Sequence, residues 1–247
     1  MSLKEVSLLA ISFKQYLYKL KAHTGLVIRL SITQIVALLL ALGGTSGMMS
    51  SGNGTVSVYM RNYSASIVIV FSLLWLTTVA ILLTTKQYKK MEMPLVGNRL
   101  SGDLSDVGLL MTASVFAGIT SSLVGVLLRV IMYFTVDRSK LVSDGFLLSF
   151  SDLLLGMVVA ILYLCLVSAV SYMIGILYRL NMAFVLLVPA AIFGSLRVYN
   201  HVFFAQSIYK FYVVDVPLPL FALKVIITSI IIFGVSMHLS NRMEANQ

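Results

Sequence analysis

Long apolar runs alternate with short polar segments along the whole chain. Six of these runs are long enough to cross the hydrocarbon core of a bilayer, which takes about 20 apolar residues in a helix. The alternation therefore predicts an all-α, polytopic membrane protein with six transmembrane helices. The predicted spans are 26–44, 65–85, 107–135, 147–171, 182–198 and 218–239. The fifth run is short and contains Pro189, so the alternative for it is a kinked or partly re-entrant segment.

The first 22 residues follow a different pattern. Their apolar residues recur every three or four positions and so form one stripe on a helix. The stripe consists of Val6, Leu9, Phe13, Leu17 and Leu20, and Lys4, Lys14 and Lys21 fall on other sides. A basic amphipathic helix of this kind lies in the plane of the lipid headgroups with its apolar face toward the lipid. The alternative is a helix that packs on the cytosolic face of the protein itself.

Composition excludes a soluble domain. Hydrophobic residues make up 59% of the chain and charged residues 11%, whereas soluble domains carry about 25% charged residues. The net charge of +9 is explained by the positive-inside rule, and it does not require a nucleic-acid partner. The single cysteine, Cys165, lies within an apolar run, so an intrachain disulfide is excluded.

The distribution of Lys and Arg predicts the orientation, because these residues accumulate on the cytosolic side of membrane proteins. With the N-terminus inside, most of them fall on the inner side: Lys4, Lys14, Lys19, Lys21, Arg29, Lys86, Lys89, Lys90, Arg99, Arg179 and Arg242. The predicted outer loops hold Arg61, Arg138, Lys140 and Lys210. An even number of spans then places both termini in the cytosol.

Two outer segments join these spans. Residues 45–64 are rich in Gly, Ser and Met, and they are predicted to form a loop. Residues 199–217 are crowded with Tyr and Phe. Tyr favours the membrane–water interface because its ring is apolar and its hydroxyl is hydrated. We expect a short interfacial helix or a re-entrant hairpin there, which acts either as an anchor or as an external gate.

Four charged residues lie within the outer halves of the predicted spans: Arg129, Asp152, Arg197 and Lys224. Charges inside a membrane are costly and usually mark a pathway or an ion pair. One hypothesis is an outer polar cluster that lines a vestibule. The alternative is that the three cations reach the outer headgroups, while Asp152 pairs with one of them.

The sequence lacks the common motifs for catalysis, cofactor binding and metal binding. The chain has no G-x-x-x-x-G-K-S/T phosphate loop, no H-E-x-x-H zinc motif and no G-x-S-x-G nucleophile motif. The fragment Leu100–Asp103 faintly resembles an ABC ATPase motif, but no second Gly or Gln follows it. We therefore expect no enzyme activity in this chain, and no catalytic, cofactor-binding or metal-binding residues.

The longest polar break between apolar runs is residues 86–106, KQYKKMEMPLVGNRLSGDLSD. Its position after the second span, together with the six spans and the N-terminal amphipathic segment, resembles the membrane subunit of an exporter-type (type 2) ABC transporter. In that family a short coupling helix joins spans two and three. Glu92, Pro94 and Arg99 resemble the family's order of acidic residue, Pro and basic residue, although Gly97-Asn98-Arg99 replaces its usual Ser-Arg. The stretch MPLVGNRLSGDLSD and the following LLMTASVFAGITSSL also resemble small permeases of Gram-positive bacteria. Several of those permeases are encoded with exporters of antimicrobial peptides or peptide toxins.

The resemblance implies a partner ABC ATP-binding subunit that binds ATP and Mg, and a second membrane subunit, identical or related. The docking residues would be Met91, Glu92, Pro94, Asn98, Arg99 and Leu100. ATP-driven closure of the partner would move the coupling helix, and the two membrane subunits would enclose a pathway for an amphipathic or hydrophobic cargo such as a peptide, toxin, drug or lipid-like molecule.

Three alternatives to the exporter are considered, and for the loop itself the alternative to docking is a solvated basic segment that follows the positive-inside rule. A membrane enzyme would need a paired acid/base or nucleophile set within the spans, and none appears in the sequence. The chain could also serve as the solute-binding membrane subunit of an importer, with the outer polar cluster as its pocket. The third alternative is a sensor or immunity protein that binds a toxin without pumping it.

Overall fold

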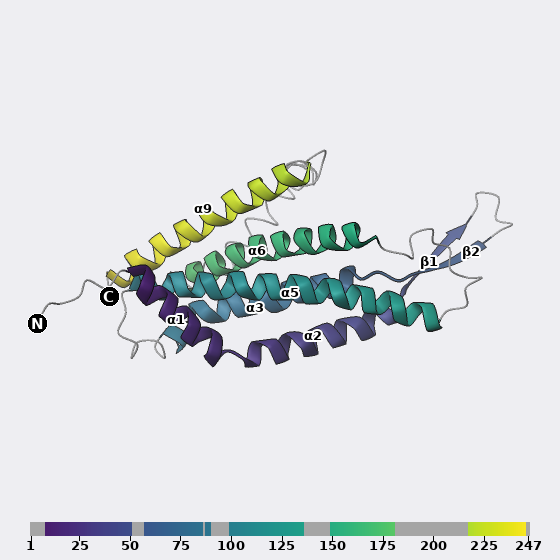
Figure 1. Cartoon of the computed structure of the whole chain (residues 1–247), viewed down its shortest axis with the longest axis horizontal. Coiled ribbons are helices and arrows are strands. Elements are labelled where there is room, and N and C mark those ends of the chain that lie inside the picture. Colours follow the sequence, from purple (N-terminus) through teal and green to yellow (C-terminus); the bar gives the residue numbers. More distant parts are fainter. Residues whose placement is uncertain are drawn as a thin grey trace, which may run out of the picture. The chain divides into compact units, whose positions relative to one another are not determined.

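The computed structural model describes residues 8–50, 57–85, 87–89, 99–135, 149–180 and 217–245. Their elements are shown in Figure 1, and their bounds are as follows: α1 (Leu8–Ala22), α2 (Gly25–Leu42), β1 (Thr45–Ser50), β2 (Ser57–Asn62), α3 (Ser66–Thr84), α5 (Arg99–Thr135), α6 (Phe150–Leu180) and α9 (Leu218–Ala245). Residues 87–89 are also helical.

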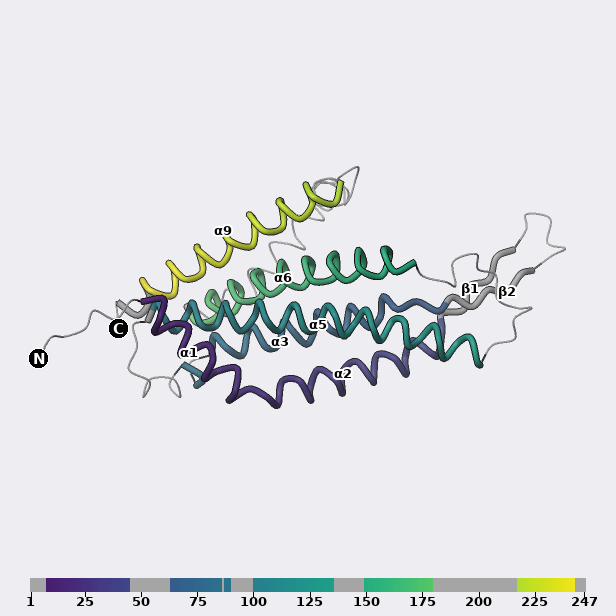
Figure 2. Tube along the Cα trace, viewed as in Figure 1, coloured from purple at the N-terminus to yellow at the C-terminus, as the bar shows by residue number. Residues whose placement is uncertain are grey.

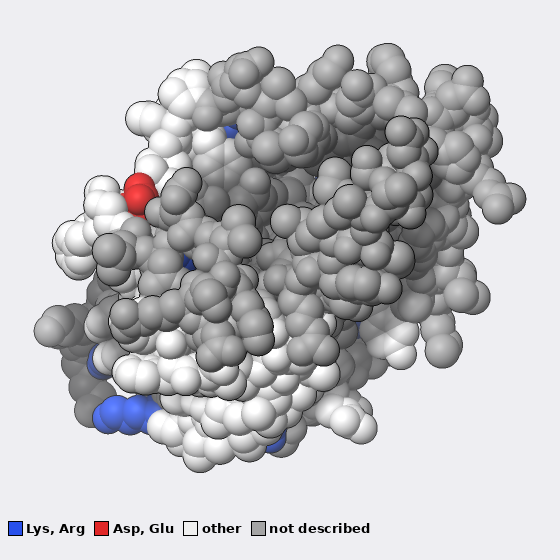
Figure 3. Space-filling model, turned by 90° about the vertical axis from the view of Figure 1, so that its right-hand side faces the viewer, with Lys and Arg blue, Asp and Glu red and all other residues white. Residues whose placement is uncertain are grey.

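Five of the described helices, namely α2, α3, α5, α6 and α9, are long and apolar enough to cross a membrane. They confirm the predicted helical, membrane-spanning character of the chain. In the end-on view of Figure 3, residues other than Lys, Arg, Asp and Glu make up most of the described surface. The predicted span 182–198 and the predicted outer segment 199–217 lie outside the described residues.

Three helices are longer than the spans predicted from the apolar runs. Helix α5 begins at Arg99 instead of at 107, α6 continues to Leu180 instead of ending at 171, and α9 continues to Ala245 instead of ending at 239. Residues 99–106, which were predicted to belong to the loop, therefore form the first turns of α5. The apolar runs appeared to stop at polar residues such as Asp106 and Tyr172, but these side chains are buried inside the protein and have hydrogen-bond partners there.

A short β hairpin follows α2, where an irregular loop was predicted. Strands β1 and β2 are antiparallel, with Thr45 opposite Asn62 and Ser50 opposite Ser57. The residue before the hairpin, Gly44, has a φ of 64°, which is a conformation that glycine adopts without the steric cost of a Cβ atom. Because residues 45–50 (TSGMMS) and 57–62 (SVYMRN) lack a regular apolar alternation, their pattern did not predict strands.

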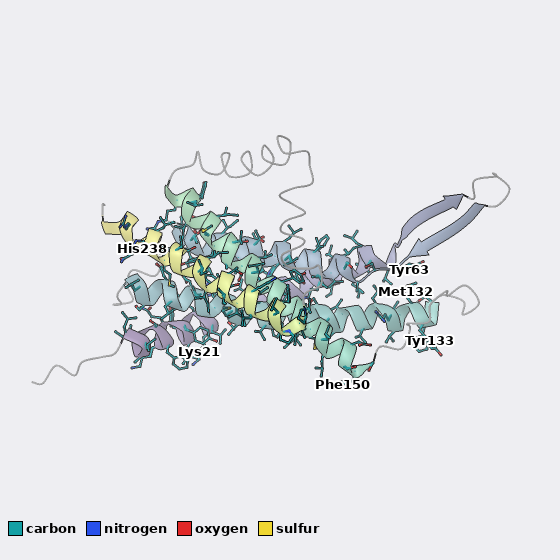
Figure 4. All side chains as sticks on the ribbon, turned by 90° about the horizontal axis from the view of Figure 1, so that it is seen from above. Lys21, Tyr63, Met132, Tyr133, Phe150 and His238 are labelled. Carbon is teal, nitrogen blue, oxygen red and sulfur yellow. The ribbon has the colours of Figure 1, made fainter. Side chains whose placement is uncertain are left out.

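The described residues fall into two compact units, and α3, α5 and α6 contribute to both. The second unit comprises Thr24–Trp75 and Val115–Ile161. Its core contains Leu38 and Ala41 of α2 together with Leu128 and Met132 of α5, and Tyr63 packs against this cluster. Figure 4 shows Tyr63 and Met132 close together.

Gln34 joins three helices of this second unit. Its Nε2 donates one hydrogen bond to Ser72 Oγ on α3 (3.1 Å) and another to Thr120 Oγ1 on α5 (3.0 Å). Ser72 in turn donates to the carbonyl oxygen of Val68 (2.9 Å), so its lone pairs remain available to accept from Gln34. Polar side chains in a membrane associate helices in this way because lipid offers them no partner.

The first unit comprises Met1–His23, Leu76–Ser114 and Leu162–Gln247. Here α6 packs on α9 through two ring contacts, Tyr163 with Phe221 and Tyr172 with Phe233, with centroid separations of 5.3 and 5.9 Å. The residue numbers rise together along both helices, so α6 and α9 are parallel. The tube in Figure 2 shows the same direction for the two helices.

Gly118 sets how closely α5 and α6 approach each other in the second unit. A Cβ at this position would lie 3.0 Å from the backbone nitrogen and 3.1 Å from the Cα of Ile161. We predict that Gly118→Ala lowers the free energy of unfolding by about 1–3 kcal/mol, because backbone atoms cannot move aside as a side chain can. Detergent-induced unfolding of the purified protein measures this change.

Gly156 provides the matched control for Gly118. It also lies within a membrane helix, but a Cβ there would meet nothing within 4 Å. Gly156→Ala should be neutral or stabilise the helix by about 0.5–1 kcal/mol. Equal destabilisation by the two substitutions would show that close packing at Gly118 is not the cause.

Candidate functional site

Two buried aspartates lie near the beginning of α5. Asp103 and Asp106 are three residues apart, so their side chains share one face of the helix. The side chains are only 5% and 0% exposed. A buried carboxylate is costly unless cations and hydrogen-bond donors surround it, so these two residues require partners from other segments.

Lys89 provides a cation for both aspartates. It lies in the helical residues 87–89, at the base of the loop that follows α3. Its Nζ atom is 2.6 Å from Asp103 Oδ1 and 2.8 Å from Asp106 Oδ2. Burial alone would lower the pKa of Lys89, but the charges of Asp106 and Asp103 and their hydrogen bonds outweigh burial and raise the pKa above its usual range. The ammonium group therefore stays charged at physiological pH. It holds residues 87–89, which we call the loop base, against α5.

Lys19 of α1 provides the second cation. Its side chain is 4% exposed and forms an ion pair with Asp106 Oδ1, and its Nζ also donates to the carbonyl oxygen of Gly102 (3.2 Å). Gly108 of α5 leaves room for the ring of Tyr16, because a Cβ there would lie 3.2 Å from the ring. The polar face of α1 thus packs on the beginning of α5.

A separate stripe of α1, beside the face that packs on α5, is apolar and exposed. Leu9 and Phe13 are 71% and 59% exposed, and Leu17 and Leu20 are exposed as well. Sequence analysis left open whether this helix packs on the protein or faces lipid. The structure shows the packing on the protein and leaves the apolar stripe uncovered.

A second contact joins α1 to the loop base. The rings of His23 and Tyr88 are 5.3 Å apart, and the Tyr88 hydroxyl forms a hydrogen bond with His23 Nε2. His23 Nδ1 lies 2.8 Å from the carbonyl oxygen of Lys19. Since a carbonyl only accepts, Nδ1 donates to the Lys19 oxygen, and Nε2 is the ring atom that meets Tyr88. The neighbours Tyr88 and Lys89 therefore hold α1 and α5 respectively.

Tyr172 of α6 completes the site. This residue is fully buried, and its hydroxyl donates to Asp103 Oδ1 (3.3 Å). We call Lys19, Lys89, Asp103, Asp106 and Tyr172 the charged network. Its two ammonium groups balance its two carboxylates, and Asp106 is shared by both lysines.

The contacts of the charged network hold separate segments of the chain together. Within the described residues, no group of three or more His, Cys, Asp or Glu side chains could hold a metal ion. Both aspartates are paired with cations. The arrangement instead connects α1, the loop base, α5 and α6 through charged and polar contacts at one place.

The residues predicted for docking fall mainly in the part of the chain that is not described. Met91, Glu92, Pro94 and Asn98 lie outside the described residues, Arg99 is the first residue of α5, and Leu100 is exposed. Their role in docking stays a prediction.

The outer polar cluster also stays a prediction. Arg129 lies on α5 and Lys224 on α9, Asp152 is exposed in the first turn of α6, and Arg197 lies outside the described residues.

Sequence analysis did not identify the charged network. Lys19 was assigned only to the inner side of the membrane, and Leu100–Asp103 was set aside as a chance likeness to an ATPase motif. A usable signal was present: the chain has nine acidic residues, and Asp103 and Asp106 stand one helical turn apart directly before a long apolar run. Acidic residues at such a position need cations from another segment.

Comparison with protein families, curated proteins and solved structures found no match to this chain. The functional interpretation therefore depends on the membrane helices, the loop and the charged network.

The charge balance of the network can be tested with matched variants. Lys89→Met leaves one cation for two buried carboxylates, and we predict a loss of about 3–5 kcal/mol in the free energy of unfolding. The double variant Lys89→Met/Asp103→Asn retains the Lys19–Asp106 pair, so the remaining network has no net charge. It should recover most of the loss in a detergent unfolding titration.

Lys21→Met serves as the control because Lys21 lies on the same helix as Lys19 but is exposed. Its effect should stay within about 0.5 kcal/mol. If the double variant is less stable than Lys89→Met alone, charge balance does not govern the stability of the network.

Proposed function

We propose that this chain is the transmembrane subunit of an ATP-driven ABC exporter. It forms part of a pathway for an amphipathic or hydrophobic cargo, such as a peptide, toxin, antimicrobial or lipid-like molecule. It couples to a separate ATP-binding subunit through the loop between α3 and α5. The observation that carries this proposal is the attachment of the loop base to α5 and α1 by the charged network.

The burial of Lys89 argues against a loop whose only role is to follow the positive-inside rule. A lysine with that role alone stays solvated, because hydration of its ammonium group is favourable. The Lys89 side chain is instead 15% exposed and contacts two carboxylates. A loop that receives force from a partner needs a rigid base of this kind, because a flexible base would absorb the movement.

The parallel course of α6 and α9 supports the proposed six spans. Consecutive spans cross a membrane in opposite directions. Because α6 and α9 run in the same direction, the chain would have to cross the membrane once more between them. The predicted span 182–198 would provide that crossing. The same topology puts α1, the loop base and the C-terminal end of α9 on one side, which the distribution of Lys and Arg identifies as the cytosol.

The arrangement of α1 supports an interfacial connecting helix. Its polar face binds the charged network, and its apolar stripe remains exposed. A helix with these two faces is suited to the boundary between the headgroups and the protein. The proposed location is the bacterial plasma membrane, with both termini in the cytosol.

The proposed assembly contains two membrane subunits, identical or related, and two ATP-binding subunits that hold ATP and Mg. Closure of the ATP-binding subunits would displace the loop, and the loop base would transmit this displacement to α1 and α5. Such a switch between two arrangements of rigid bodies is a common way to use nucleotide energy. In this account the chain itself performs no catalysis.

Copurification tests the proposed docking. The chain in mild detergent should retain an ABC ATP-binding subunit encoded beside its gene, and Glu92→Ala or Arg99→Ala should each reduce the retained amount about 10-fold, as loss of an interfacial charge pair costs 1.4 kcal/mol or more. The measurement is the ratio of the two proteins after affinity purification.

Arg138→Ala is the matched control, because Arg138 lies in a loop predicted for the other side of the membrane. It should leave the ratio unchanged. If the unaltered chain retains no ATP-binding subunit, the exporter proposal is wrong, and a toxin-binding sensor or immunity protein becomes the better account.

A further inference from the structure

Tyr172 occupies an unusual position in the first unit. It is among the largest side chains that are fully buried. Its two ends meet different elements: the hydroxyl donates to Asp103 of α5 (3.3 Å), and the ring packs on Phe233 of α9 with a centroid separation of 5.9 Å and an interplanar angle of 55°. This ring geometry falls in the range that is favourable for aromatic pairs.

The backbone around Tyr172 is held tightly against α3. The neighbouring Ser171 donates a hydrogen bond to Thr77 Oγ1 (3.2 Å). At Gly175, one turn later, a Cβ atom would clash with the side chain of Thr84. Because this part of α6 is fixed to α3, Tyr172 is anchored by its backbone while its side chain bridges α5 and α9.

A continuous series of contacts therefore leads from the loop base to α9. Lys89 contacts Asp103, Asp103 accepts from Tyr172, and Tyr172 packs on Phe233. Each contact involves a side chain that is buried or nearly so. A displaced carboxylate would pull on the tyrosine hydroxyl, and the rigid ring would transfer that displacement to the phenylalanine.

We propose that Tyr172 is a positioning residue that couples the charged network at the loop base to helix α9. The functional meaning of this coupling depends on the proposed role of the loop in transport. The physical coupling itself depends only on the contacts within the first unit.

A tyrosine that merely fills space would behave differently. Substitutions at Lys89 and Phe233 would then have independent effects, since distant sites normally contribute additively to stability. A coupled pair departs from additivity, and the departure disappears when the linking group is removed. This difference separates coupling from ordinary packing.

The test is a triple-mutant cycle on the full chain in detergent. With Tyr172 present, the unaltered chain is compared with Lys89→Met, with Phe233→Leu and with the double variant. The same comparison is then repeated with Tyr172→Phe in all four proteins. Tyr172→Phe removes the hydroxyl and keeps the ring against Phe233. The midpoint of thermal unfolding is followed with a thiol-reactive dye, for which Cys165 is the single target.

With Tyr172 present, we expect the midpoint of the double variant to depart from additivity by about 2–4 °C. With Tyr172→Phe, the effects of Lys89→Met and Phe233→Leu should add. Additive effects in the presence of Tyr172 would overturn the proposal. Equal departures from additivity in both backgrounds would also overturn it, because the coupling would then bypass the hydroxyl.

Phe221 provides a matched control on the same helix. It is buried to a similar degree as Phe233, and it makes a ring contact with Tyr163 of α6. The effects of Phe221→Leu and Lys89→Met should add in both backgrounds.

If Lys89→Met does not fold, Lys89→Arg replaces it, because arginine keeps the charge and changes the contact geometry. The cycle uses this chain alone. Its outcome is therefore independent of whether the loop binds an ATP-binding subunit.

Discussion

Asp106 lies near the beginning of the membrane helix α5, and its side chain has no exposed surface. The packing of α1 and of the loop base against α5 depends on the ion pairs of this carboxylate. One of its oxygens meets Lys19 of α1 and the other meets Lys89 at the loop base. Desolvation of buried ion pairs consumes much of the energy that their attraction releases, whereas loss of one partner is strongly destabilising. The network therefore contributes less to overall stability than to specifying which segments meet. It joins α1 and the loop base at one shared carboxylate, beside the separate contact of His23 with Tyr88.

The sequence was sufficient to predict the five described membrane helices, because lipid requires long apolar segments whose backbone groups are satisfied internally. It was less reliable at helix ends, where side chains such as Asp106 and Tyr172 interrupt the apolar pattern but are buried among partners from other helices. The β hairpin was missed for another reason. Its strands, Thr45–Ser50 and Ser57–Asn62, are short and lack a regular alternation of apolar residues.

The candidate site was harder to predict because its residues are far apart in the sequence. Lys19 and Asp106 are separated by 87 positions, and nothing in the local pattern of either segment identifies the other as its partner. Sequence reasoning located the loop that follows α3 but assigned its importance to Glu92 and Arg99. The structure adds the anchored base of that loop, where Tyr88 and Lys89 bind α1 and α5.

Hydrogen–deuterium exchange of the full chain in lipid nanodiscs tests the central claim most directly. If Asp106 holds both α1 and the loop base, Asp106→Asn should accelerate amide exchange in α1 and in residues 87–89. Asp103→Asn removes a partner of Lys89 but not of Lys19, so it should accelerate exchange at 87–89 and leave α1 unchanged. Equal exchange of α1 in the two variants would contradict the account, because α1 would then not depend on the shared carboxylate.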